Sequence, residues 1–138
     1  MKFVVPSRWL KTTLGVDALV SGAVALLHLL AADALAAWLA LPRALLLGSG
    51  AFLVAYVALL TALARAPRVP SALIALVVAG NVLWALGCLA LLGGAVASNA
   101  PGASFLVLHA ATVLTFAAFE WRGLRTSAPA PRLRVARA

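Results

Sequence analysis

Four long apolar runs, each almost free of charged residues, dominate this sequence and restrict the folds open to it. Each run has about 18 residues or more, the length that a helix needs to cross a hydrocarbon layer of roughly 30 Å. Because no water reaches the backbone in that layer, such runs form helices. Hydrophobic residues make up 65% of the chain and charged residues 10%, which excludes a water-soluble globule and a disordered chain. The sequence predicts an all-α, polytopic four-helix membrane bundle.

The breaks between the runs divide a single transmembrane domain, residues 1–125. We expect spans at about residues 10–31, 43–64, 71–92 and 102–124. Pro42 fits the first turn of the second span, because an N–H group at that position would have no hydrogen-bond acceptor within the helix. Ser71 follows a proline-rich basic loop and is expected to cap the third span. Gly93 and Gly94 end that span.

A short helix is expected between the first two spans. Asp33 can cap a helix from Ala34 to Leu41 that lies in the outer interface, with Trp38 at headgroup depth. In that arrangement the first span begins near residues 8–9 and ends near residue 31. The alternative is a first span over residues 14–32 without an interfacial helix.

Lysine and arginine are divided unequally between the two sides of the predicted bundle. Ten of the eleven lie in the N-terminal segment, the loop between the second and third spans, and the C-terminal tail, whereas only Arg43 lies opposite. The positive-inside bias then places both termini in the cytoplasm. Residues 126–138 are expected to form a flexible basic cytoplasmic tail.

The positions of the basic residues also bear on partners. They flank the apolar runs and are not interleaved with base-reading side chains, so the +8 charge does not indicate nucleic-acid binding. The expected partners are the lipid bilayer and either further copies of the chain in a homo-oligomer or a larger membrane complex.

Two pairs of ionisable residues lie within the spans, each with a spacing of eleven residues. Asp17 and His28 share one face of the first helix, because eleven residues make three turns plus about 20°. His109 and Glu120 share a face of the fourth in the same way. The two helices are antiparallel, so packing them together places Asp17 level with Glu120 and His28 level with His109. Ionisable residues at membrane depth are candidates for function.

Other polar residues extend this intramembrane layer. Ser21 lies on the face of Asp17 and Thr112 near that of His109, while Tyr56 and Asn81 come from the second and third spans. Asn81 is expected to hydrogen-bond between helices. In a purely structural role, the histidines would bond each other, and the carboxyl groups would share a proton or meet basic residues within snorkelling reach. The residues within that reach are Arg8, Lys11, Arg122 and Arg125.

A cofactor site is a further alternative, although the expectation is that none is bound. His28 and His109 could serve as axial ligands of haem b from facing helices. Cys88, near the outer end of the third span, would complete a His, His and Cys set suited to copper or zinc. A single cysteine excludes an intrachain disulfide.

The sequence contains no recognisable catalytic motif, which favours a protein that is not an enzyme. The function expected first is an accessory or structural membrane subunit with a polar intramembrane layer. The alternative is an oligomeric proton- or ion-coupled small transporter or channel, in which the carboxyl and imidazole groups form a relay. The haem- or metal-binding redox protein is the third interpretation.

Some sparse features resemble those of small, uncharacterised four-span inner-membrane proteins of GC-rich bacteria. They are Asp17 with Gly22 in the first span, the Leu41-Pro42 entry to the second, Asn81-x-x-Trp84, and the late Glu120. The resemblance covers residues 16–124. It implies the four-helix fold and the membrane location, and it assigns no activity or site residue.

Overall fold

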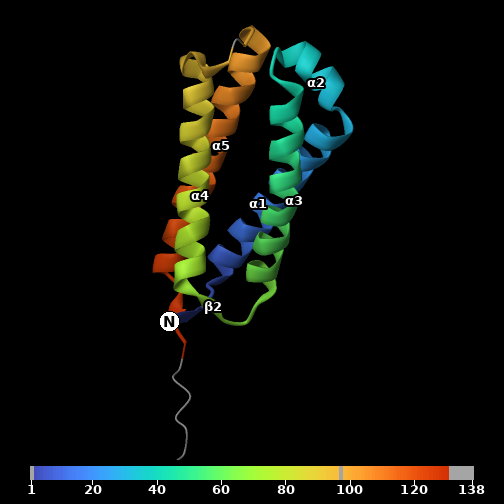
Figure 1. Ribbon diagram of the computed structural model, residues 1–138. Coiled ribbons are helices and arrows are strands. Elements are labelled where there is room, and N and C mark those ends of the chain that lie inside the picture. The colour runs from blue at the N-terminus through green and yellow to red at the C-terminus, as the bar shows by residue number, and fades with distance from the viewer. Residues whose placement is uncertain (1, 97, 131–138) are drawn as a thin grey trace, which may run out of the picture.

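The computed structural model describes residues 2–96 and 98–130, in which four long helices form an elongated bundle (Figure 1). The long helices are α1 (Arg8–Leu30), α3 (Arg43–Arg65), α4 (Ser71–Ala90) and α5 (Ala100–Arg125), and α2 (Ala32–Leu39) is short. A π-helical turn, Leu91–Ala95, extends α4. All four long elements have the length and hydropathy of membrane spans. The predicted all-α class is confirmed, as are four helices long and apolar enough to cross a membrane.

The helices pack as two pairs, α1 with α3 and α4 with α5, and the pairs meet where α1 crosses α5 (Figure 1). Glycine permits the close approaches. A Cβ built on Gly50 of α3 would lie 2.9 Å from Leu29 Cγ, and one on Gly123 of α5 would lie 2.9 Å from Leu10 Cβ. Small residues at such positions let helix backbones approach closely. Close packing matters in a membrane, because burial of apolar surface contributes little to helix association there.

Two apolar layers fill the bundle. The layer near the termini contains Leu10, Leu14, Leu60, Ile74 and other buried side chains. The layer at the opposite end is built from α2 to α5. Asp17, Ser21, Asn81 and Glu120 are buried but belong to neither layer. Hydrogen bonds between these four side chains join them into a polar cluster.

A small sheet, not predicted from the sequence, joins the two ends of the described chain. Strand β1 (Phe3–Val5) pairs antiparallel with β2 (Val69–Pro70) and with β3 (Ala128–Pro129). Ser7, the N-cap of α1, accepts from Leu10 N at 3.1 Å and donates to Gly123 O at 3.3 Å. The prediction of a flexible tail from residue 126 is therefore wrong for residues 126–130, and residues 131–138 lie outside the described residues.

The sequence predicted the short helix but not its capping. α2 spans Ala32–Leu39 instead of residues 34–41, and no side chain caps it. Asp33 lies in its first turn and forms an ion pair with Arg43. The left-handed backbone of Ala40, with φ of 51°, ends the helix. Trp38 is 65% exposed, which suits the predicted interfacial position.

Prolines occupy the N-cap positions of the next two long helices. Pro42 precedes α3 and Pro70 precedes α4. Ser71 is thus the first residue of α4 and not its cap, and its hydroxyl donates to Lys2 O at 3.2 Å. Gly94, with φ of 104°, kinks the backbone inside the π-helical turn Leu91–Ala95, and the helical segment ends just after the predicted glycine pair.

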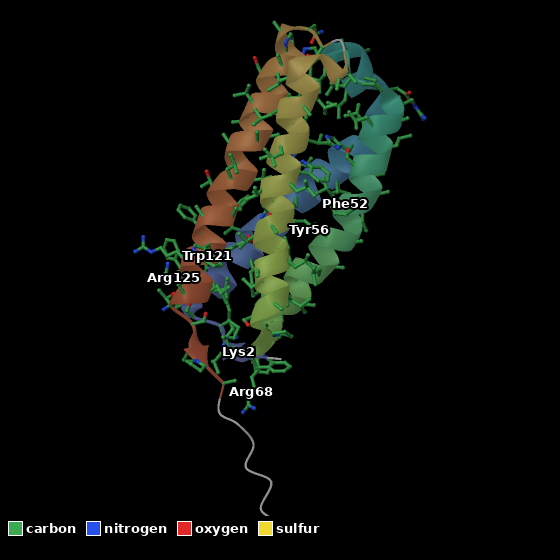
Figure 2. All side chains as sticks on the ribbon, turned by 60° about the vertical axis from the view of Figure 1, so that its left-hand side comes forward. Lys2, Phe52, Tyr56, Arg68, Trp121 and Arg125 are labelled. Carbon is green, nitrogen blue, oxygen red and sulfur yellow. The ribbon has the colours of Figure 1, made fainter. Side chains whose placement is uncertain are left out.

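Both ends of the described chain lie at the same end of the bundle, because β1 and β3 are neighbouring strands. Lys2, Arg68 and Arg125 lie at this end too (Figure 2). Arg43 begins α3 at the opposite end. The charge asymmetry of the sequence therefore corresponds to the two ends of the folded bundle.

Candidate functional site

Two carboxyl groups and one amide form the centre of the polar cluster. Asn81 Nδ2, on α4, donates to Asp17 Oδ2 on α1 at 3.2 Å and to Glu120 Oε2 on α5 at 3.1 Å. The amide therefore links three helices. The prediction that Asp17 and Glu120 lie at one level is confirmed, as is the interhelical role of Asn81.

Two hydroxyl groups complete the hydrogen bonds of Asp17. Ser21, one turn later on α1, donates to Asp17 Oδ1 at 2.8 Å. Tyr56 on α3 donates to Asp17 Oδ2 at 3.1 Å. Asp17 and Glu120 are both 0% exposed. Both oxygens of Asp17 accept hydrogen bonds, as a buried carboxylate requires.

Glu120 is bonded on one side only. Its Oε2 accepts from Asn81, whereas its buried Oε1 has no hydrogen-bond partner among the described residues. An unpaired polar oxygen in an apolar interior is unfavourable by about 1–3 kcal/mol. Oε1 is therefore the position in this cluster that can take up a proton or another positively charged group.

The cluster contains no basic side chain. Within the described part of the chain, the single ion pair joins Asp33 and Arg43 at the surface. The expectation that basic residues within snorkelling reach meet the carboxyl groups is therefore wrong for this structure. Arg122 contacts an aromatic ring instead of a carboxyl group, with its Cζ 5.6 Å from the centre of the Trp9 ring. Each donor to Asp17 and Glu120 from the described residues is a neutral hydroxyl or amide group.

A cavity of about 440 Å³ adjoins the cluster and takes lining from all four long helices. Ser21, Tyr56 and Asn81 form part of its wall. The same three side chains donate to the carboxyl groups. The rest of the wall is almost entirely apolar, and it contains no lysine or arginine. A molecule in this cavity would contact the donors that hold Asp17 and Glu120.

Aromatic rings cross the bundle at this cavity. Phe52 stacks on Tyr56 of its own helix with ring centres 6.3 Å apart, and on Trp84 of α4 at 5.4 Å. Trp84 in turn stacks on His109 of α5 at 6.1 Å. Figure 2 shows Phe52 and Tyr56 on α3, beside α4. Phe52 is 56% exposed, so this wall reaches the outer surface of the bundle.

A second cavity, of about 400 Å³, lies beyond these rings. Its lining includes His28, Ser49 and Cys88. It shares Phe52, Trp84 and His109 with the first cavity, so the stacked rings stand between the two. Phe52 and Trp84 were not predicted from the sequence to belong to a site. The four-residue spacing of Phe52 and Tyr56 indicated that the two rings lie on one face of the second span.

The two histidines lie near each other but have different partners. His28 Nδ1 is 2.8 Å from Ser49 Oγ, and His28 Nε2 is buried with no partner among the described residues. The Phe105 ring lies 5.9 Å from the His28 ring and 5.5 Å from the His109 ring. His28 therefore bonds Ser49 instead of His109 as expected, and the Phe105 ring packs near both histidines.

The remaining candidates do not join the carboxyl cluster. Thr112 lines the first cavity, but its hydroxyl donates to Leu108 O of its own helix at 2.8 Å. Cys88 is buried in the second layer. Within residues 2–96 and 98–130, no three His, Cys, Asp or Glu side chains converge as metal ligands would. The haem and metal roles of His28, His109 and Cys88 stay predictions.

Comparison with known proteins adds no assignment to this geometry. No protein-family model, curated protein or solved structure matches the chain.

Proposed function

We propose that this chain is a small proton-coupled transporter of the bacterial inner membrane, with both termini in the cytoplasm. The observation that carries the proposal is a buried pair of carboxyl groups that, among the described residues, has only neutral donors and one unpaired oxygen, Glu120 Oε1. Transporters use carboxyl groups at membrane depth to take up and release protons. The charge asymmetry between the two ends of the bundle supports the orientation.

The pair Asp17–Glu120 is the proposed proton site. Two carboxylates that share a buried site cannot both ionise without large repulsion. The titratable group that faces them from α3 is Tyr56, the group from α4 is the neutral Asn81, and Ser21 faces them from α1. A proton on Glu120 Oε1 would neutralise half of the formal charge and leave every existing hydrogen bond intact.

The cavity supplies the means of coupling. Tyr56 and Asn81 belong both to its wall and to the hydrogen bonds of the carboxyl pair. A substrate that displaces either donor would weaken the bonds to Asp17 and change the affinity of the pair for its proton. By thermodynamic linkage, protonation would change the affinity for the substrate by the same factor.

Transport also requires access from both sides of the membrane. The cavity lies where the two helix pairs meet, and the rings of Phe52, Trp84 and His109 separate it from the second cavity. A relative movement of the pairs would open one cavity and close the other. Assembly of several copies, the homo-oligomer expected from the sequence, would suit such a small bundle.

The test is proton movement in proteoliposomes that contain a trapped pH dye. Lipophilic compounds of three classes, cationic, neutral and anionic, are added outside under an imposed pH gradient. We expect at least one class to change the internal pH in the wild type and not in Glu120→Gln. If no class moves protons in protein shown to be folded by gel filtration, the transporter proposal is wrong. The accessory subunit then becomes the better interpretation.

A further inference from the structure

The first cavity has walls suited to an apolar molecule. Its lining includes Phe52, Tyr56, Trp84, Phe105 and Phe116, with aliphatic side chains from each long helix. Its volume of about 440 Å³ lies within the roughly 300–1,000 Å³ typical of small-molecule pockets. Because Phe52 is more than half exposed, a molecule dissolved in the lipid phase can reach the wall from the side.

The charge beside the cavity selects the sign of such a molecule. Asp17 and Glu120 lie behind Tyr56 and Asn81, and no basic side chain lies within ion-pair distance of them in the described residues. When a carboxyl group of this pair is ionised, no nearby basic side chain balances its charge, and the cavity then has a negative potential. In a region of low dielectric constant, that potential acts strongly on a charged molecule. A cation is attracted and an anion is repelled.

The rings add a second preference for positive charge. The face of an aromatic ring carries negative charge, and tryptophan attracts cations most strongly. Trp84 is in the wall of the cavity, stacked between Phe52 and His109. Aromatic faces and carboxyl groups together form a combination that recognises organic cations, and the apolar wall disfavours small hydrated ones.

We infer that this cavity binds apolar organic cations and that each bound cation displaces one proton from Asp17–Glu120. The inference rests on the proposed proton-coupled transport and names its substrate class. The exchange balances in charge: the cation brings one positive charge beside the pair, and Glu120 Oε1 releases one proton to water. The total charge of the occupied site stays constant, which avoids an additional buried charge.

The experiment uses tetraphenylphosphonium and tetraphenylborate, which have the same four-phenyl shape and opposite charge. Each is added to purified full-length protein in a neutral detergent and weak buffer. Calorimetry measures binding, and a pH dye measures protons released in the same sample. We expect the cation to bind with release of about one proton for each molecule bound, and the borate to show neither effect.

Variants separate the roles of ring and carboxyl group. Trp84→Leu should weaken binding of the cation about tenfold, whereas Trp38→Leu, a change at the exposed tryptophan of α2, should leave it unchanged. Tyr56→Phe keeps the ring and removes the hydroxyl bond to Asp17. It should therefore keep binding within about threefold but alter the proton release. Glu120→Gln should bind the cation without releasing a proton.

The outcomes distinguish this inference from the function on which it rests. Binding of the borate with proton movement would overturn the cation inference and leave proton coupling standing. Binding of the cation without proton release would support the cation site and contradict the coupling. Failure of the cation to bind, or equal binding by Trp84→Leu and wild type, would overturn the inference.

Discussion

Asp17 and Glu120, on two different helices, are joined through the two hydrogens of a single amide group. Asn81 donates to Asp17 Oδ2 at 3.2 Å and to Glu120 Oε2 at 3.1 Å. Both oxygens of Asp17 are bonded, whereas Glu120 Oε1 has no partner in the part of the chain that the structure describes. The two carboxyl groups thus differ in their hydrogen bonds, and Asp17 and Glu120 should respond differently to substitution.

Replacing Asn81 should destabilise the bundle. Asn81→Leu keeps a side chain of similar size but removes both hydrogen bonds, so Glu120 loses its one donor. We expect a loss of about 1–3 kcal/mol, the usual effect of leaving a buried polar group unpaired. Thermal unfolding in detergent, followed by circular dichroism, measures the change.

Thr115→Val is the matched control for this change. The Thr115 hydroxyl is exposed and bonds only Ala111 O of its own helix. We expect its removal to change stability by less than about 0.5 kcal/mol. Equal stability of Asn81→Leu and Thr115→Val would show that the amide bridge contributes nothing.

The two carboxyl groups should respond differently to neutralisation. Glu120→Gln keeps an oxygen for Asn81 and puts an NH₂ group at the position of the unpaired Oε1, so we expect stability to be maintained within about 0.5 kcal/mol. Asp17→Asn replaces one of the two accepting oxygens with an NH₂ group, which then faces a hydrogen-bond donor. We expect this variant to lose about 1–3 kcal/mol of stability. Unfolding temperatures of the two variants in one detergent decide the order, and the reverse order would contradict the assigned hydrogen bonds.

Adding one methyl group at Gly50 should separate α1 from α3. The new Cβ would lie 2.9 Å from Leu29 Cγ and 3.0 Å from His28 Cβ, both closer than ordinary contact. Gly50→Ala should therefore lose about 1–3 kcal/mol through overpacking.

Gly48→Ala, two residues earlier on the same helix, provides the comparison. A Cβ at Gly48 meets nothing within 4 Å, so alanine should be neutral or gain up to about 1 kcal/mol from helix propensity. Both are measured as shifts in unfolding temperature. A tolerated Gly50→Ala would mean that α1 and α3 are not as close as described.

The orientation can be tested with single cysteines in a Cys88→Ala background. Ala95 lies exposed at the end beyond α4, and Ala128 lies exposed in β3 at the terminal end. We expect a membrane-impermeant maleimide added to intact cells to label Ala95→Cys and not Ala128→Cys. After the cells are opened, both should react. Labelling of Ala128→Cys in intact cells would reverse the proposed orientation.

The four spans could be predicted because hydropathy and length act over many residues at once. That Asp17 and Glu120 lie at the same depth followed from helical geometry. Each is eleven residues from a histidine on its own helix, and because the two helices are antiparallel, the two carboxyl groups come to the same end. The sequence could not show that Asn81 would bond both groups. That contact depends on how far α4 is rotated and shifted against its neighbours.

Local pairings were harder to predict for the same reason. The strands β1, β2 and β3 have two or three residues each, too few for a periodic pattern, and they come from distant parts of the chain. Ser49 as the partner of His28 depends on the close approach that Gly50 permits. Such contacts are fixed by packing between helices, which composition and spacing do not specify.

The central claim is that the Asp17–Glu120 pair holds an exchangeable proton, and infrared spectroscopy of the reconstituted protein tests it most directly. A protonated carboxyl group has a carbonyl stretch separate from that of a carboxylate, and the band shifts in D₂O when the proton exchanges. We predict this band in the wild type near neutral pH, its shift in D₂O, and its loss in Glu120→Gln. A wild-type spectrum without the band, or one that Glu120→Gln leaves unchanged, would contradict the account.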